Sequence, residues 1–284
     1  MNPRSLLLDT AARFRAAGIP DPETDSALLL SFLTGQAPLS LRLDSDTELS
    51  AEILESFSEM AERRLAREPL QYITGEAPFF GRVFQVDSRV LIPRPETEEL
   101  CAWALETLPV SDSCRVLDLC CGSGCIGLTL AAERPSLQVT LSDCSRDALD
   151  VAAANAARYS LQVSLRCGDL AEGLPPASFD CVVSNPPYIP SAECGVLQPE
   201  VLREPSLALD GGADGMDFYR RISDECVRIL RPDGILLLEL GYGESDAVSS
   251  LLAAAGFTGI TVRKDFSGIA RMMLAVSPAR RNYV

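Results

Sequence analysis

The sequence predicts an α/β protein with a mostly parallel sheet, preceded by a small helical-bundle domain and a β-hairpin linker. From residue 114 onward, short apolar runs alternate with helical patterns, as is typical of parallel strands joined by crossover helices. Residues 1–75 instead carry apolar side chains at helical spacing between clear stop signals. Over residues 76–92 the apolar period shortens towards that of a strand. We therefore expect a helical domain over residues 1–75, a hairpin linker over 76–92 and an α/β domain over 93–284.

Three helices are expected in the first part, and each is ended by glycine or proline. The first covers about residues 6–17 and stops at Gly18, and the second carries several leucines before Gly35. The third covers about residues 47–67, and Pro69 forces its end. The sequence of this helical domain does not by itself indicate any reaction or ligand.

The linker reads as a hairpin followed by an extended segment. Residues 79–86 approach strand periodicity around Gly81, which is a good turn residue. Two prolines in residues 92–95 then keep the chain extended, because a residue before proline avoids the helical region. A helix over residues 95–108 follows, with acids in its first turn.

The third part alternates strands and helices along the chain. Two final strands follow each other without a helix, so we expect an antiparallel pair at the sheet edge. We place the strands near 114–119, 137–143, 162–168, 179–184, 234–240, 258–264 and 270–276, and the helices near 123–133, 146–158, 215–230 and 245–255.

Composition excludes several kinds of chemistry. The 284 residues contain no histidine, so serine or cysteine catalysis through imidazole and histidine-ligated zinc are ruled out. The single lysine, Lys264, does not follow a glycine-rich loop, which excludes a Walker-type phosphate loop. A net charge of −15 disfavours a partner held through many phosphate contacts, so we expect no direct binding of nucleic acid.

The ten cysteines show no CxxC pair, and the N-terminus lacks the apolar region of a signal peptide. We therefore expect reduced, buried cysteines, a cytoplasmic protein and no metal site. No run of ~18 apolar residues occurs, so no membrane span is expected.

A glycine-rich turn follows the first strand of the third part. Gly122, Gly124 and Gly127 match the spacing of a dinucleotide-binding loop, with Asp143 about 20 residues further on. Asp118 argues against that literal interpretation, because an acid at the end of the strand suits a ligand with a cationic ammonium group. S-adenosylmethionine carries such a group.

Two further strand ends carry acids. Asp143 closes the second strand, where a carboxylate is placed to accept protons from both ribose hydroxyls, although an N-cap of the next helix is the alternative. Asp169 follows the third strand and could accept from an adenine amino group while Leu170 covers the ring; a lone acid there is more often a turn residue.

The most specific motif lies at residues 184–188, directly after the apolar fourth strand. Two prolines remove N–H donors and fix carbonyl acceptors, Asn185 adds a side-chain acceptor, and Tyr188 offers an aromatic face. Together they suit a planar NH2 group. The alternative is a Pro-Pro strand terminator with a packed tyrosine.

These motifs resemble those of class I S-adenosylmethionine-dependent methyltransferases with a Rossmann-like sheet, whose Asn-Pro-Pro-Tyr motif serves planar amino or amide nitrogens. The resemblance is most specific to peptide chain release factor glutamine methyltransferases (PrmC/HemK) and covers nearly the whole chain. The segments that carry it are Gln71–Glu76, Leu91–Glu98, Asp118–Gly124, Asn185–Ile189, Glu204–Leu209 and Gly211–Gly215.

The resemblance implies methyl transfer to the glutamine of the GGQ motif in class 1 release factors, with S-adenosyl-L-homocysteine as product. It implies that residues 1–75 recognise the substrate, and that Asn185, Pro186, Pro187 and Tyr188 bind it, with Asn185, Pro186 and Tyr188 catalytic. The implied cofactor residues are Cys120, Cys121, Gly122, Ser123, Gly124, Asp143, Asp169, Leu170 and Asn185.

Two residues depart from the family pattern. Cys120 replaces a glycine of the loop, and Leu170 stands where some members carry an aromatic residue, so cofactor affinity is expected to be weaker. We expect a monomer whose acidic surface attracts a basic protein substrate. The alternatives are an amino methyltransferase acting on DNA or RNA bases and a non-catalytic scaffold with the same fold.

Overall fold

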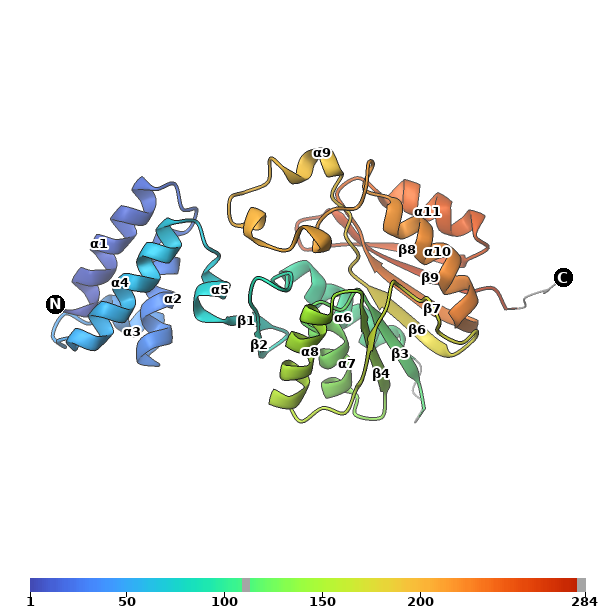
Figure 1. Cartoon of the computed structure of the whole chain (residues 1–284), viewed down its shortest axis with the longest axis horizontal. Helices are drawn as coiled ribbons and strands as arrows, with labels where there is room; N and C mark the ends of the chain where they lie inside the picture. The colour runs from blue at the N-terminus through green and yellow to red at the C-terminus, as the bar shows by residue number, and fades with distance from the viewer. Residues whose placement is uncertain (109–112, 280–284) are drawn as a thin grey trace. The chain divides into compact units, whose positions relative to one another are not determined.

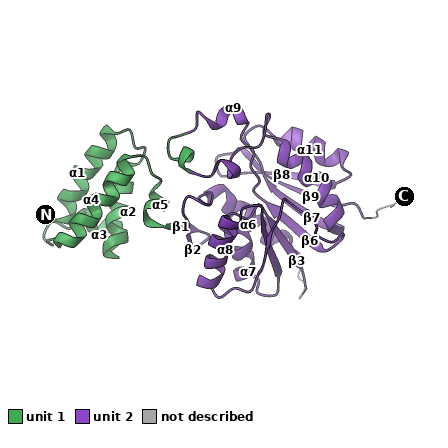
Figure 2. Ribbon diagram, in the orientation of Figure 1, with its two compact units in different colours: residues 1–76, 198–203 green, residues 77–197, 204–284 purple. Residues whose placement is uncertain are grey.

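The computed structural model describes residues 1–108 and 113–279 and divides into two compact units (Figures 1 and 2). Unit 1 comprises Met1–Glu76 and Gln198–Arg203, and unit 2 comprises Ala77–Leu197 and Glu204–Val284. Unit 1 therefore includes six residues that are remote in sequence from the rest of it.

Unit 1 is a bundle of short helices around a core of leucine and phenylalanine side chains, among them Phe14, Leu30 and Phe57. The helix expected over 47–67 begins only at residue 51, because the Ser50 side chain accepts from the amide of Ile53 and caps it. Two short helices were not predicted; one starts at Pro38 and the other starts directly after Pro69. The helices are α1 (Pro3–Ala16), α2 (Pro22–Thr34), α3 (Pro38–Leu43), α4 (Ala51–Leu65) and α5 (Leu70–Thr74).

The expected hairpin is present as β1 (Glu76–Phe79) and β2 (Arg82–Gln85). Phe80 and Gly81 both have positive φ, 49° and 72°, as a two-residue hairpin turn requires. Asn155 accepts from the amide of Gln85 at 2.7 Å, which ties β2 to a helix of unit 2.

Unit 2 contains a seven-stranded sheet in the order β5-β4-β3-β6-β7-β9-β8. The first five strands of that order pair in parallel, and β9 is antiparallel to both neighbours, as the sequence predicts. The strands are β3 (Arg115–Leu119), β4 (Gln138–Asp143), β5 (Ser164–Cys167), β6 (Phe179–Ser184), β7 (Leu230–Glu239), β8 (Thr258–Lys264) and β9 (Ala270–Val276).

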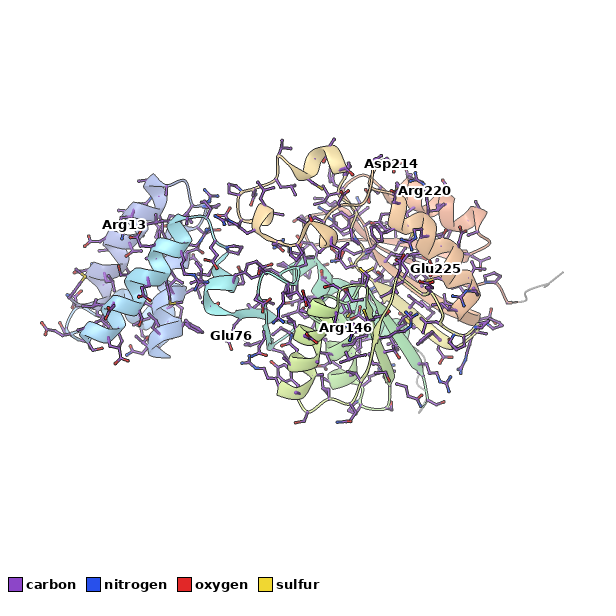
Figure 3. All side chains as sticks on the ribbon, in the orientation of Figure 1. Arg13, Glu76, Arg146, Asp214, Arg220 and Glu225 are labelled. Carbon is purple, nitrogen blue, oxygen red and sulfur yellow. The ribbon has the colours of Figure 1, made fainter. Side chains whose placement is uncertain are left out.

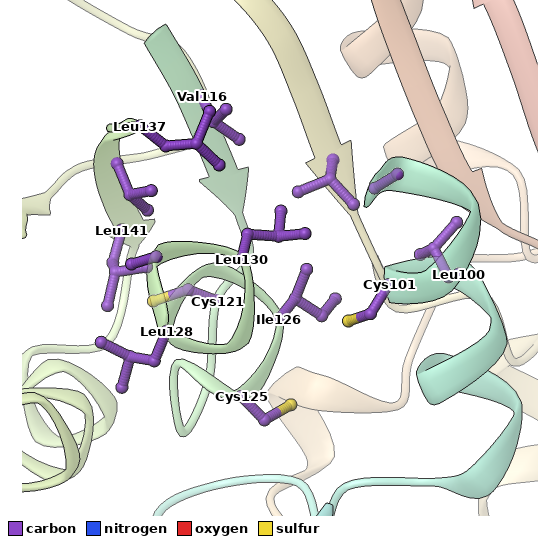
Figure 4. Close-up of a cluster of buried hydrophobic side chains, with 14 of the residues drawn as sticks. Leu100, Cys101, Val116, Cys121, Cys125, Ile126, Leu128, Leu130, Leu137 and Leu141 are labelled. Carbon is purple, nitrogen blue, oxygen red and sulfur yellow. The ribbon is translucent and has the colours of Figure 1, made fainter. Parts of the chain in front are cut away.

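Helices cover both faces of this sheet (Figure 1). Alternate residues of β3 point to opposite sides, so that Val116 joins the core under the first group of helices and Leu117 joins the other core. Figure 4 shows part of the first core, where Leu128 and Leu141 lie close to Cys121. The first group is α6 (Pro95–Thr107), α7 (Cys125–Glu133) and α8 (Arg146–Arg158), and the second is α10 (Asp217–Ile229) and α11 (Ser245–Ala254).

A long connection follows β6 and holds only short elements. Ile189 forms a parallel bridge with Asp210 and closes the connection at its base. Its elements are α9 (Ser191–Cys194), η1 (Val201–Arg203) and η2 (Ser206–Ala208), of which η1 belongs to unit 1.

The expectation that all cysteines are buried was wrong, since Cys144 and Cys167 are exposed at the ends of β4 and β5. All ten are free thiols. Surface charges are often paired, as with Arg220 and Asp214 on unit 2, whose side chains meet at 2.5 Å (Figure 3).

Candidate functional site

The glycine turn lies at the carboxyl end of β3, where open parallel sheets bind ligands. Gly124 has φ of 79° and caps α7, a conformation that favours glycine. At Gly127 a Cβ atom would lie 2.3 Å from Leu141 Cδ2, so only glycine lets α7 pack this closely on the sheet. Gly124 and Gly127 therefore each have a defined steric reason.

Asp118 lies beneath this turn and is 0% exposed. Its Oδ2 accepts from the amide of Gly127 at 2.8 Å, while Oδ1 is buried without a hydrogen-bond partner among the described residues. Burial raises the pKa of this carboxyl to about 7, against the lowering effect of the Gly127 amide, and Asp143 raises it further. Asp118 thus supports the loop through Oδ2, and the expectation that it suits a ligand with a cationic group remains a prediction.

Cys120 adopts φ of 61°, in the left-handed region that glycine tolerates and other residues adopt at a cost of about 1–2 kcal/mol. This explains why glycine is the usual residue at this position of the family pattern. The loop keeps the glycine-type conformation despite the substitution.

Asp143 ends β4 with both carboxylate oxygens engaged by backbone amides. Oδ2 accepts from Gly122 and Oδ1 from Ser145, each at 2.9 Å. The N-cap of α8 is Ser145, whose hydroxyl accepts from the amide of Ala148. The capping role considered for Asp143 therefore belongs to Ser145, and the aspartate instead fixes the glycine turn.

A cavity of about 730 Å³, partly open to solvent, lies against these strand ends. Among the residues selected from sequence, its walls include Cys120, Gly122, Asp143, Asp169, Leu170, Asn185 and Pro187. The remaining ones lie outside the cavity lining, namely Cys121, Ser123, Gly124, Pro186 and Tyr188.

Asp169 and Leu170 occupy opposite environments at this cavity. Asp169 is exposed, and its carboxylate forms an ion pair with Arg221 at 2.7 Å. Leu170 is only 4% exposed and has φ of 45°, so its apolar side chain is fixed against the cavity.

The Asn-Pro-Pro-Tyr segment is connected to a buried polar network. Asn185 Nδ2 donates to Thr97 Oγ1 at 3.4 Å, and Thr97 Oγ1 donates to Glu239 Oε2 at 2.6 Å. The Tyr188 hydroxyl lies 3.5 Å from the other oxygen of Glu239. Burial raises the pKa of Glu239 to about 7 and that of Tyr188 well above its usual range.

Motif segments that are far apart in sequence meet around this site. Glu204 accepts from the amide of Ile92 at 3.0 Å and pairs with Arg94 at 2.5 Å. At Gly215 a Cβ would lie 2.4 Å from the carbonyl oxygen of Tyr188, so the glycines after residue 210 allow close packing on the Asn-Pro-Pro-Tyr segment.

Sequence reasoning missed several of these residues. Arg89, Val90 and Leu91 of the linker line the cavity, although no motif marks the first two. Glu239 was detectable in principle, because it is a charged residue inside the apolar run of β7. Thr97 lies in the motif segment Leu91–Glu98, but that segment gave no role to the threonine. Further cavity residues that were missed are Pro205, Leu207, Ala208 and Phe218.

Within residues 1–108 and 113–279, no cluster of acidic, cysteine or histidine side chains could hold a metal ion. No helix in the same residues has the length and apolar character needed to cross a membrane.

Comparison with known proteins first identifies the class. Residues 101–204 match the model of the methyltransferase small domain. The fold is similar to that of a methyltransferase from Pyrococcus furiosus, with a TM-score of 0.55 at 15% identity over 81% of this chain and 100% of the other. Together with the parallel sheet and the glycine turn, this defines a class I methyltransferase fold.

Sequence relatives then define the family. Residues 5–75 match the PrmC N-terminal domain. The release factor glutamine methyltransferase of Caulobacter vibrioides is 42% identical over 93% of this chain and 92% of its own length. That of Deinococcus radiodurans is 40% identical over 97% and 98%. The chain belongs to the release factor glutamine methyltransferase family.

Proposed function

We propose that this chain transfers a methyl group from S-adenosyl-L-methionine to the side-chain amide nitrogen of the glutamine in the GGQ motif of peptide chain release factors. The observation that carries the proposal is one cavity lined both by Asn185 and Pro187 and by Gly122 and Asp143. The Asn-Pro-Pro-Tyr segment, which would bind the glutamine amide and is called the amide pocket below, thus adjoins the glycine turn. The family membership supports the same reaction.

The residues around the glycine turn fit the methyl donor. When bound, S-adenosylmethionine supplies an electrophilic methyl group on a sulfonium. Asp143 would accept hydrogen bonds from the ribose hydroxyls. Each carboxylate oxygen already accepts one hydrogen bond from a backbone amide and keeps a further lone pair for this purpose. Leu170 would cover the adenine and Asp169 would accept from its amino group. The backbone from Cys120 to Gly124 would form the rest of the cradle.

Asn185 and Pro186 would orient the substrate amide. The nitrogen of an amide is a poor nucleophile because its lone pair is delocalised. Hydrogen bonds from its NH2 group to Asn185 Oδ1 and the Pro186 carbonyl would direct the nitrogen towards the methyl group, at ~3–3.5 Å. As the nitrogen becomes cationic, these acceptors bind it more tightly than in the ground state, and Tyr188 completes the pocket.

No imidazole base is present to remove the proton, since the chain contains no histidine. The proton would leave to water after the transfer. The reaction then depends on alignment and on acceptors placed for the developing charge.

We further propose that the protein acts as a cytoplasmic monomer on class 1 release factors in translation termination. Residues 1–75 and 189–213 would bind the protein substrate. The net charge of −15 favours a basic protein partner over direct binding of nucleic acid. A base amino methyltransferase would share the Asn-Pro-Pro-Tyr motif, but the relatives and this charge do not favour it.

The decisive experiment offers tritiated S-adenosylmethionine with release factor, with release factor whose GGQ glutamine is replaced by alanine, and with nucleic acid. We expect label only in intact release factor. The Asn185→Ala variant should lose about 10²–10³-fold in kcat, because it removes an acceptor for the reacting amide. Its dissociation constant for S-adenosylmethionine, measured by calorimetry, should change much less.

Label in nucleic acid would instead support the base methyltransferase. A normal rate for Asn185→Ala would disprove the mechanism while leaving the substrate assignment intact.

A further inference from the structure

A buried carboxyl lies behind Asn185 and does not line the cavity. Glu239 ends β7 and is 2% exposed, and Thr97 in the first turn of α6 is equally buried at 2%. No salt bridge to Glu239 is found among the described residues. A buried acid without an ion pair is costly, so its hydrogen bonds must offset much of that cost.

The hydrogen bonds of Thr97 have a fixed direction while Glu239 is ionised. A threonine hydroxyl has one hydrogen, and the carboxylate can only accept it, at 2.6 Å. The Thr97 oxygen can therefore only accept from Asn185. Asn185 meets it with Nδ2 at 3.4 Å, which leaves Oδ1 outside this chain of bonds.

The same carboxyl contacts the second residue of the amide pocket. Oε1 of Glu239 lies 3.5 Å from the Tyr188 hydroxyl, on the opposite oxygen from Thr97. Glu239 is thus linked to Asn185 through Thr97 and contacts Tyr188 directly.

We propose that Glu239, acting through Thr97, is a positioning residue that fixes the orientation of the Asn185 side-chain amide. Asn185 then presents its oxygen, and not its NH2 group, to the nitrogen that accepts the methyl group. The inference rests on the proposed function, because the reversed amide would set two donors against the donors of a glutamine NH2 group.

The charge state of Glu239 controls this direction. Once protonated, Glu239 can donate to Thr97, whose hydroxyl is then able to donate to Asn185, so the reversed amide is no longer disfavoured. Burial raises the pKa of Glu239 to about 7, and the hydrogen bond from Thr97 opposes this. The other groups near it are Glu96 and Cys101 of α6, Cys125 of α7, Tyr188, Tyr219 of α10 and Arg271 of β9.

Orientation is needed for turnover, so we expect activity to fall as the pH drops below about 7, where Glu239 gains its proton. Thr97→Val removes the hydroxyl at nearly constant volume and should lower kcat for release factor about 10–100-fold. Thr97→Ser keeps the hydroxyl and should stay within about threefold of the wild type. Glu239→Gln cannot titrate and should lose the activity change near pH 7.

A second readout does not depend on activity. In nuclear magnetic resonance spectra, the side-chain NH2 signals of Asn185, assigned by their loss in Asn185→Ala, should shift between pH 6 and 8. The shift should be absent in Thr97→Val and in Glu239→Gln. Calorimetric binding of S-adenosylmethionine should change little in Thr97→Val and in Thr97→Ser, which would show that the site remains folded in both variants.

Two results would overturn the proposal: wild-type kcat in Thr97→Val, or Asn185 signals that do not respond to pH. If the wild type failed to label release factor while the Asn185 signals titrated as described, the proposed substrate would be wrong and the positioning role would stand.

Discussion

The buried acids Asp25 in unit 1 and Asp118 and Glu239 in unit 2 are treated in opposite ways, although elsewhere in unit 2 the buried Glu204 is paired with Arg94. In unit 1, Arg64 lies between Asp25 and Glu200, with Nε and Nη1 each 2.8 Å from a carboxylate oxygen. In unit 2, Asp118 and Glu239 are 0% and 2% exposed, and no arginine or lysine pairs with either among the described residues. The first arrangement compensates buried charge, whereas the second leaves it sensitive to protons.

The pKa values follow this difference in part. Burial raises the pKa of Asp25 although the hydrogen bond from Arg64 lowers it, so the ion pair offsets only some of the effect of burial. Burial acts to raise the pKa of Glu200, but hydrogen bonds from Arg67 and Arg64 outweigh it and lower the pKa to about 2. Burial raises the pKa of Asp118 and of Glu239 to about 7. Asp25 and Glu200 thus hold unit 1 together through Arg64, while Asp118 contacts the glycine turn and Glu239 contacts the Asn-Pro-Pro-Tyr segment.

The largest effect is expected when the Arg64 ion pairs of unit 1 are broken. Arg64→Met would leave the buried Asp25 without its cation, while Glu200 keeps Arg67, so we expect unit 1 to lose about 3 kcal/mol of unfolding free energy. Urea titration followed by far-ultraviolet circular dichroism reports both units, whereas fluorescence of the single tryptophan, Trp103, reports unit 2.

Arg13→Ala is the matched control, because Arg13 pairs with Glu62 at the surface of the same helical bundle, with 49% of its side chain exposed. It should change stability by less than about 1 kcal/mol. Equal losses in Arg64→Met and Arg13→Ala would show that burial of the pair is unimportant.

The second prediction concerns an unpaired acid in unit 2. With its folded pKa raised to about 7, Asp118 binds a proton more tightly in the native state than in the unfolded chain. Its contribution to stability is therefore full below about pH 4 and is lost as the pH rises to about 7. The stabilisation of unit 2 by Asp118→Asn should therefore be about 2–3 kcal/mol larger at pH 8 than at pH 5.

The measurement is urea unfolding of both proteins at the two pH values, followed by Trp103 fluorescence. A stability difference between variant and wild type that is the same at both pH values would mean that the Asp118 charge is compensated, as in unit 1.

The smallest expected effect concerns an acid that lies at the cavity wall. Asp143→Ala removes the acceptor for the amides of Gly122 and Ser145 and for the ribose, so we expect the dissociation constant for S-adenosylmethionine to rise about 10–30-fold. Calorimetry measures this directly. Asp147→Ala, an exposed acid in the first turn of α8, should change the constant by less than about twofold. Equal effects would indicate a general charge effect.

The fold was largely predictable because its signals are local. Alternating apolar runs and glycine or proline stops placed the strands of unit 2 and most helices. The short helix α3 was missed because six residues are too few for a periodic pattern. The start of α4 was misplaced because Ser50, three residues after the expected start, provides the cap.

Residues of the candidate site were predictable only where a local motif also fixes their position in the fold, as at the end of a strand. Asn185 follows β6 directly and Gly122 follows β3 after two residues, and parallel strands bring their carboxyl ends to one edge. Thr97 and Glu239 are separated by 142 positions in the chain, so no local pattern relates them. Cavity residues such as Phe218 were missed for the same reason.

The sequence by itself determined the order of the elements, the glycine turn and the amide motif, because each depends on neighbouring residues. Tertiary structure alone decided which acids are compensated: Arg64 reaches Glu200 across the chain, and no arginine or lysine forms a salt bridge with Asp118 or Glu239 among the described residues. The physical reason is that a pKa depends on burial and on partners in space, and neither can be read from adjacent positions.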